Sequence, residues 1–283
     1  KSDDAADLDA FHKLDIRDQA SLLKRFYDDE KKYLKAITDR VGRERHSLSH
    51  GLLASLETKE NVTTNYDDLF ERACSAPDSD LAVLPYEPVE RNQAHRWLLK
   101  LHGSLSRPAD IVLTRDGYLG LPNRAGALFG LVQAMLLTRH MFFVGYSLSD
   151  ESFHKVLHEV RMAQRGSDQD GDDTETSSPL GTALILQPEP LFAQLFENDL
   201  EIVAVANTDE DITSAERRFE IFLDHLAYQA ADVRSFFMDP TYASMLDPEE
   251  QTTFRQLEEV RNNLPPGPIG QAVQSFLDDL GSP

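Results

Sequence analysis

The chain has 283 residues, of which 49 are acidic and 28 are basic, and its formal net charge at pH 7 is -21. This length suits one large domain with an extension, and the acidic balance opposes direct binding to nucleic acid or to anionic membranes. The single cysteine, Cys74, excludes a disulfide framework and indicates a cytoplasmic location, and no apolar run approaches the ~20 residues of a membrane helix.

The predicted elements alternate between helices and short strands. Two helices are expected first, over residues 18–41 and 47–56. Short apolar runs, read as strands, follow at residues 61–64, 97–101, 111–114, 141–146, 183–187 and 201–206. Helical stretches at residues 67–74, 127–139 and 150–164 separate most of them. This alternation predicts an α/β fold with a Rossmann-like, mostly parallel sheet and helices on both faces.

The C-terminal part reads differently. Residues 166–179 contain no large apolar side chain, which predicts a mobile acidic loop. Three further helices are expected, over residues 215–229, 247–263 and 272–280. We therefore expect a main domain at residues 1–232 and a helical C-terminal extension at residues 233–283, which would serve packing or assembly.

Polar side chains follow two of the predicted strands. Asn65 and Asp67 come after the strand at 61–64, and His102 comes after the strand at 97–101. Ligands of open α/β sheets bind at the carboxyl ends of strands, so these side chains are expected to converge on one cleft. The Asn65 amide can hold a water molecule, or it can cap the helix that begins near Asp67.

The other two side chains have alternative roles as well. His102 can act as a general base near neutral pH, although a histidine at a strand end is more often structural. Asp67 can stabilise the start of a helix through the helix dipole, or it can neutralise positive charge that develops on a bound sugar. The sequence leaves both roles open.

Several residues around this cleft suit a dinucleotide. Gly145 permits a tight turn before the helix that opens near Asp150, where Ser147 and the amides of the helix start can bind pyrophosphate. Gly103 allows the backbone to approach a ligand closely. The hydroxyls of Thr63 and Thr64 are expected to face the same crevice, although their methyl groups can equally pack within the strand.

Four motifs give the chain a family resemblance: T-T-N-Y-D at residues 63–67, K-L-H-G-S at 100–104, I-V-L-T-R-D-G-Y at 111–118 and F-F-V-G-Y-S-L-S-D-E-S-F at 142–153. In this order and spacing the chain resembles the sirtuin-like family over roughly residues 10 to 230, specifically the bacterial branch that destroys NAD+.

The resemblance implies roles for individual residues. It implies Asn65, His102 and Asp67 as catalytic residues, and it implies cofactor-binding roles for a second set: Thr63, Thr64, Gly103, Gly145, Tyr146 and Ser147. It also implies an NAD+ hydrolase that releases nicotinamide and ADP-ribose as an NAD-depleting effector of bacterial anti-phage defence. The implied partners are NAD+ and either further copies of the chain or a nucleic-acid-handling defence protein, with no direct contact to nucleic acid or membrane.

Two departures from the family pattern stand out. The family's glycine-rich G-A-G-x-S loop has no counterpart before Thr63, and the first forty residues contain no glycine. No four-cysteine zinc module interrupts the chain between His102 and Val144, so we expect no metal, and water in place of an acyl-lysine as the acceptor. The alternatives are a non-catalytic Rossmann module that senses NAD or ADP-ribose, and a sirtuin-type deacylase or ADP-ribosyltransferase, which the missing zinc ligands disfavour.

Overall fold

A computed structural model of the protein describes residues 5–75, 81–89, 96–148, 150–165, 178–231 and 236–282. The chain divides into two compact units, Lys1–Ala227 and Tyr228–Pro283. The expected acidic loop at 166–179 falls almost wholly outside the described residues, as residues 166–177 are not among them. No helix in the described ranges is long and apolar enough to span a membrane.

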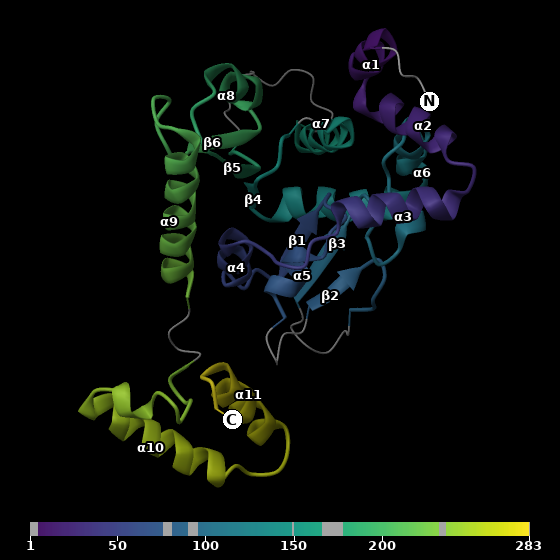
Figure 1. Ribbon diagram of the computed structural model, residues 1–283. Coiled ribbons are helices and arrows are strands. Elements are labelled where there is room, and N and C mark those ends of the chain that lie inside the picture. Colours follow the sequence, from purple (N-terminus) through teal and green to yellow (C-terminus); the bar gives the residue numbers. More distant parts are fainter. Residues whose placement is uncertain are drawn as a thin grey trace. The chain divides into compact units, whose positions relative to one another are not determined.

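The first unit is built from parallel strands interleaved with helices (Figure 1). Its elements are α1 (Ala5–His12), α2 (Ile16–Phe26), α3 (Glu30–Val41), α4 (Leu48–Ala54), β1 (Glu60–Thr63), α5 (Leu69–Ala73), β2 (Leu81–Leu84), β3 (Arg96–Lys100), η1 (Pro108–Asp110), α6 (Arg115–Thr138), β4 (Met141–Val144), α7 (Glu151–Arg165), β5 (Gly181–Ile185), α8 (Pro190–Phe196), β6 (Leu200–Ala204) and α9 (Ile212–Ala230). The last residues of α9 pass into the second unit. The predicted α/β class is confirmed.

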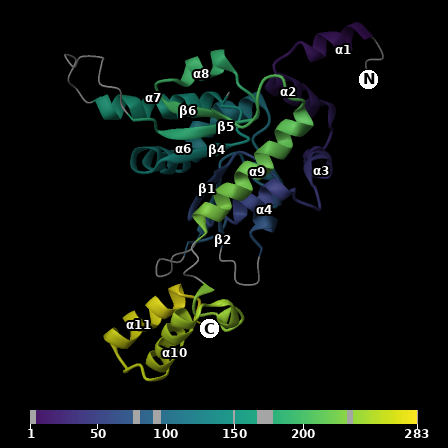
Figure 2. The ribbon, with the colours of Figure 1, turned by 90° about the vertical axis from the view of Figure 1, so that its left-hand side faces the viewer.

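The described strands form two sheets of three, in the orders β1-β3-β2 and β4-β5-β6, and every pairing is parallel. The two sheets share one apolar core, because Leu99 and Leu101 of the first sheet lie in the same buried cluster as Phe143 and Ala183 of the second. Helices α6 and α7, which pack on each other, complete this core. Helix α9 lies at the outside of the unit (Figure 2).

Two of the expected helices have other bounds in the structure. The helix expected over residues 18–41 is two helices, because α2 ends at Phe26 and the Asp29 carboxylate accepts a hydrogen bond from the Lys31 amide to begin α3. Helix α6 begins at Arg115, well before residue 127, and its first part is interrupted by a kink at Ala125. Strand β2 and the helices α1 and α8 were not expected.

Residues 111–114 were expected to form a strand, and they do not form one. Val112 is fully buried, and this burial explains the apolar pattern. Its amide donates to the His102 carbonyl and its carbonyl accepts from the Tyr66 hydroxyl, so neither group pairs with a strand. Thr114 then caps α6 by accepting from the Gly117 amide.

The second unit is helical, with η3 (Ala243–Met245), α10 (Pro248–Asn262) and α11 (Pro268–Asp279). Met238, Phe254 and Leu277 are its buried side chains of large size. The Asp247 carboxylate accepts from the amides of Glu249 and Glu250, which fixes the start of α10.

Candidate active site

The loop after β1 presents Asn65 to solvent. The backbone N–H of Asn65 donates to the Thr63 hydroxyl at 3.0 Å, whereas the Asn65 side chain makes no hydrogen bond to the residues that the structure describes. Helix α5 has Asp68 at its N-cap, and Asp67 accepts from the Leu69 amide at 3.1 Å. Asp67 therefore occupies the helix-start position that the sequence left open, and Asn65 does not cap the helix.

Lys100 fixes this loop from below. It is the last residue of β3, it lies opposite Thr63 of β1, and its side chain is 0% exposed. Its ammonium group lies 2.6 Å from a Glu71 carboxylate oxygen and 3.5 Å from the Tyr66 carbonyl, and it also donates to the Asp67 carbonyl. All three donors of the buried ammonium are thereby used, which removes much of the cost of burying its charge.

His102 lies two residues beyond the end of β3 and is 3% exposed. Its Nε2 atom is 3.2 Å from Asp150 Oδ2, and the carboxylate side chain of Asp150 is 14% exposed. Its ring packs edge-on against Tyr118, with centroids 5.3 Å apart. Because Asp150 immediately precedes α7, this contact brings the carboxyl ends of β3 and β4 together.

Several tyrosines surround the histidine. Burial raises the pKa of Tyr66 above its usual range, and the neighbouring Tyr118 raises it further. Burial also raises the pKa of Tyr118, and the Asp150 carboxylate adds to the effect. Both phenols therefore stay protonated near neutral pH and can donate hydrogen bonds, as Tyr66 does to Val112 at 2.7 Å.

Burial raises the pKa of Asp150, but other interactions outweigh this effect. The contact with His102, the charge of that ring and the amides of Ser152 and Phe153 together hold the pKa of Asp150 below its usual value. The Ser152 amide donates to Asp150 Oδ1 at 2.8 Å. This donor at the start of α7, which the sequence assigned to pyrophosphate, is thus already occupied.

The loop between β4 and α7 turns sharply. Gly145 and Leu148 both have a positive φ, of 63° and 54°, and Leu148 is held in this unfavourable conformation by burial, being 1% exposed. The Tyr146 ring stacks on Phe143 and meets Phe153 edge-on, and burial raises the pKa of Tyr146. Gly145 and Ser147 are exposed, so a ligand can reach them.

Gly103 and the two threonines have more local roles than expected. Gly103 is buried with φ 95°, and a Cβ atom there would lie 2.5 Å from the Asp110 carbonyl oxygen. The close approach that requires this glycine is thus to the chain's own backbone. Thr63 and Thr64 are both partly buried, and only the Thr63 hydroxyl has a hydrogen bond among the described residues.

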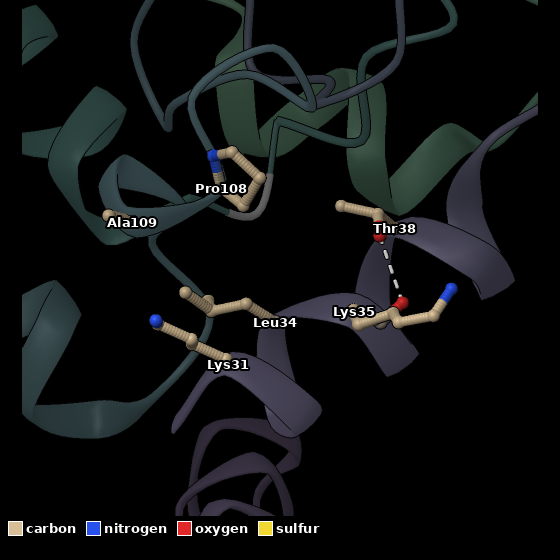
Figure 3. A pocket seen from close by; sticks show the side chains of 6 residues that line it. All are labelled: Lys31, Leu34, Lys35, Thr38, Pro108 and Ala109. Carbon is tan, nitrogen blue, oxygen red and sulfur yellow. Dashed lines mark hydrogen bonds between the residues drawn. The ribbon is translucent and has the colours of Figure 1, made fainter. Parts of the chain in front are cut away.

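A cleft in the described residues lies elsewhere, between α3 and η1 (Figure 3). It encloses about 400 Å³, and its lining residues are Lys31, Leu34, Lys35, Thr38, Pro108 and Ala109. None of the expected site residues lines it. It is open and shallow, and the Thr38 hydroxyl on its wall is bound to the Lys35 carbonyl.

The sequence analysis did not single out Lys100, Tyr66, Tyr118 or Asp150. Lys100 had a visible signal, because a lysine within the apolar run W-L-L-K-L of a buried strand requires a partner. Asp150 was noted only as the start of a helix. Its contact with His102 joins residues 48 positions apart, and local sequence patterns do not reveal such a contact.

Comparison with known proteins places this geometry in a family. A profile of the SIR2-like domain matches residues 59–202, which include every expected site residue. Defense-associated sirtuin 2 of Bacillus subtilis is 29% identical over 122 residues, covering 42% of this chain and 12% of that protein. The NAD(+) hydrolase ThsA of Acinetobacter baumannii is 27% identical over 160 residues, or 53% of this chain and 33% of that protein.

A second ThsA, from Enterococcus faecium, is 29% identical over 134 residues, covering 46% of this chain and 28% of that protein. The chain thus spans a third or less of the length of these relatives. The domain match covers half of the chain and contains both strand ends that carry Asn65 and His102. The chain belongs to the family of SIR2-like domains.

Proposed function

We propose that this protein hydrolyses NAD+ to nicotinamide and ADP-ribose. The observation that carries the proposal is the exposed Asn65 side chain, which has no hydrogen bond to the described residues. Asn65 follows β1, and β1 pairs with β3, the strand that precedes His102. An amide in that position is free to hold a water molecule. The distant relationship to proteins named NAD(+) hydrolase supports NAD+ as the substrate.

The proposed reaction breaks the bond between C1′ of the ribose and the nicotinamide nitrogen. The electron pair of that bond passes to the nicotinamide nitrogen, which becomes neutral, and positive charge develops on the sugar. Asn65 orients a water molecule toward C1′, whose oxygen forms the new bond, and His102 receives the proton of the water. Asp67, one of whose oxygens is fixed at the start of α5, lies in the same loop and can neutralise charge on the sugar.

We propose that the remaining expected residues help to hold the dinucleotide in two ways. The exposed Gly145 and Ser147, with Thr64, are accessible for direct contact. Thr63, Gly103 and Tyr146 shape the site, through the Thr63 bond to the Asn65 amide, the tight turn at Gly103 and the packing of Tyr146 on the core.

The test is nicotinamide release from NAD+ by the full-length protein and its variants. Asn65→Ala is expected to lower the rate by ~10² to 10³ or more without loss of folding, because an exposed group that acts by orientation contributes little to stability. His102→Ala is expected to lose activity to a similar degree while keeping part of its NAD+ affinity. Asn263→Ala and His140→Ala remove exposed side chains that are not among the proposed site residues. They serve as matched controls and should retain the wild-type rate.

A rate near that of the wild type in folded Asn65→Ala contradicts the catalytic assignment. Binding of NAD+ without any cleavage supports the alternative of a sensing module, against which the presence of both Asn65 and His102 speaks, because a sensor needs neither. Transfer of ADP-ribose to a protein supports the third alternative. These three outcomes are distinguished by the products.

We also propose that NAD+ cleavage serves anti-phage defence; the similarity to a Bacillus subtilis protein named a defense-associated sirtuin supports a role in defence. Residues 1–232 would carry the activity and residues 233–283 would serve assembly. With a net charge of -21, the chain is suited to dock on a basic, nucleic-acid-handling partner or to form oligomers whose contacts bury few acidic side chains. Mass measurement with and without such a partner tests this assignment.

A further inference from the structure

We infer that Asp150 is a positioning residue that holds the His102 imidazole through Nε2 and leaves Nδ1 to receive the proton. The inference rests on the proposed function in one respect, that His102 takes a proton during cleavage. It concerns a carboxylate and a histidine that follow strands of different sheets, since His102 follows β3 and Asp150 follows β4.

The first support is the isolation of the imidazole nitrogen. His102 Nε2 is a buried polar atom without a hydrogen bond in the described part of the chain, and Asp150 Oδ2 lies 3.2 Å from it. This distance is that of an ion pair, but the angles do not meet hydrogen-bond geometry. Catalytic hydrogen bonds are often poorly aligned before substrate binds and become aligned in the complex.

The second support is that the carboxylate is fixed from its other side. Asp150 Oδ1 accepts from the Ser152 amide at 2.8 Å, at the start of α7, where the helix dipole also favours an ionised carboxylate. The preceding turn is held by Leu148, which is buried with a positive φ. One oxygen is thus engaged by the helix, and the other faces the imidazole.

The chemical consequence follows from the two nitrogens of the ring. A carboxylate beside Nε2 favours the tautomer with hydrogen on Nε2, so that Nδ1 keeps the lone pair that accepts a proton. Once Nδ1 has accepted a proton, the same carboxylate stabilises the imidazolium. A carboxylate that orients a histidine in a hydrolytic triad acts in this way.

The other charged or titratable groups near the ring come from five elements and their loops: Tyr66 after β1, Tyr118 of α6, Tyr146 after β4, Arg17 of α2 and Glu151 of α7. The tyrosines are neutral near pH 7, and Arg17 is paired with Glu151 at 3.1 Å. Arg17 lies over Tyr118, on which His102 also packs. In contrast to these groups, Asp150 presents to the imidazole a carboxylate that pairs with no other basic side chain among the described residues.

The test is Asp150→Asn, because an asparagine keeps an oxygen that can cap α7 and removes only the charge. We expect kcat for NAD+ cleavage to fall on the order of 10- to 100-fold with a small change in KM, since the carboxylate acts through His102. Asp211→Asn is the matched control, since Asp211 caps α9 through the Thr213 and Ser214 amides and should behave as wild type.

A second measurement does not depend on catalysis. The position of the hydrogen on the His102 imidazole is measured by NMR from the shifts of the two ring nitrogens, with the signals assigned by their absence in His102→Gln. The wild type is expected to carry the hydrogen on Nε2, and this preference is expected to weaken in Asp150→Asn and in Asp150→Ser, a second variant that keeps a capping oxygen.

The outcomes separate the two proposals. If the wild type cleaves NAD+ and Asp150→Asn matches it in kcat and KM, the positioning role is wrong and the proposed function stands. If the wild type does not cleave NAD+, the NMR measurement still decides, since an unchanged position of the ring hydrogen in both variants overturns the role of Asp150.

Discussion

Replacement of Lys100 by methionine tests how the Asn65 loop is held. Methionine has a similar length and no charge, so the change removes the ammonium that binds the Tyr66 and Asp67 carbonyls and the Glu71 carboxylate. Loss of these contacts releases the backbone that directly follows Asn65. The expected result is a less stable protein with a misplaced Asn65 side chain.

The magnitude follows from the burial of the pair. The Lys100 side chain is 0% exposed and that of Glu71 is 17% exposed, so the variant leaves a mostly buried carboxylate without its partner. Breaking a buried ion pair costs about 3 to 5 kcal/mol, and the partial exposure of Glu71 places the expected loss near the lower end, at about 3 kcal/mol. A domain of typical stability remains folded after such a loss.

Urea unfolding of the wild type, Lys100→Met and Lys100→Met/Glu71→Leu measures this effect. The double variant is expected to recover a large part of the loss, because it no longer buries an unpaired carboxylate. Lys35→Met is the matched control: Lys35 pairs with Asp39 on an exposed helix surface and should change stability by less than about 1 kcal/mol. A loss in Lys100→Met as small as that of Lys35→Met refutes the reasoning.

Two further predictions concern stability. Gly103→Ala is expected to destabilise the protein by at least ~2 kcal/mol in thermal or urea unfolding, because the φ of 95° and a Cβ contact of 2.5 Å with Asp110 both oppose a side chain. The control is Gly51→Ala in α4, where a Cβ meets nothing within 4 Å, and this variant should be neutral or stabilising. Equal losses of stability in the two variants would contradict this account. The pKa of Asp150 is lowered on folding from 3.8, so its stabilising contribution is fully present above that pH and is lost as pH falls through the lower folded value. The free energy of unfolding should therefore decline less steeply in Asp150→Asn than in the wild type as pH falls below 3.8, and identical slopes would show that Asp150 is not responsible.

Much of the site was predictable because parallel strands share one carboxyl edge. The patterns at β1 and β3 located Asn65 and His102 beyond the ends of neighbouring strands, and the register of Thr63 with Lys100 places them at the same edge. Local patterns also identified Gly145 as a turn residue, as its positive φ bears out.

The rest depended on contacts between distant residues. The apolar segment at 111–114 was taken for a strand because burial and strand pairing produce the same pattern, and here the buried Val112 binds His102 and Tyr66 instead. Strand β2, Leu81–Leu84, contains one β-branched residue, Val83, so its local pattern is a weak strand signal. The contact of Asp150 with His102 arises from the packing of two sheets, which periodicity along one chain does not encode.

The most direct test of the proposed function is a product analysis of NAD+ incubated with the full-length protein. Hydrolysis predicts that nicotinamide and free ADP-ribose appear in equal amounts, and that both fall together by at least ~10²-fold in Asn65→Ala. Release of nicotinamide without matching free ADP-ribose, or equal product formation by folded Asn65→Ala, would contradict the proposal that Asn65 directs water onto the ribose of NAD+.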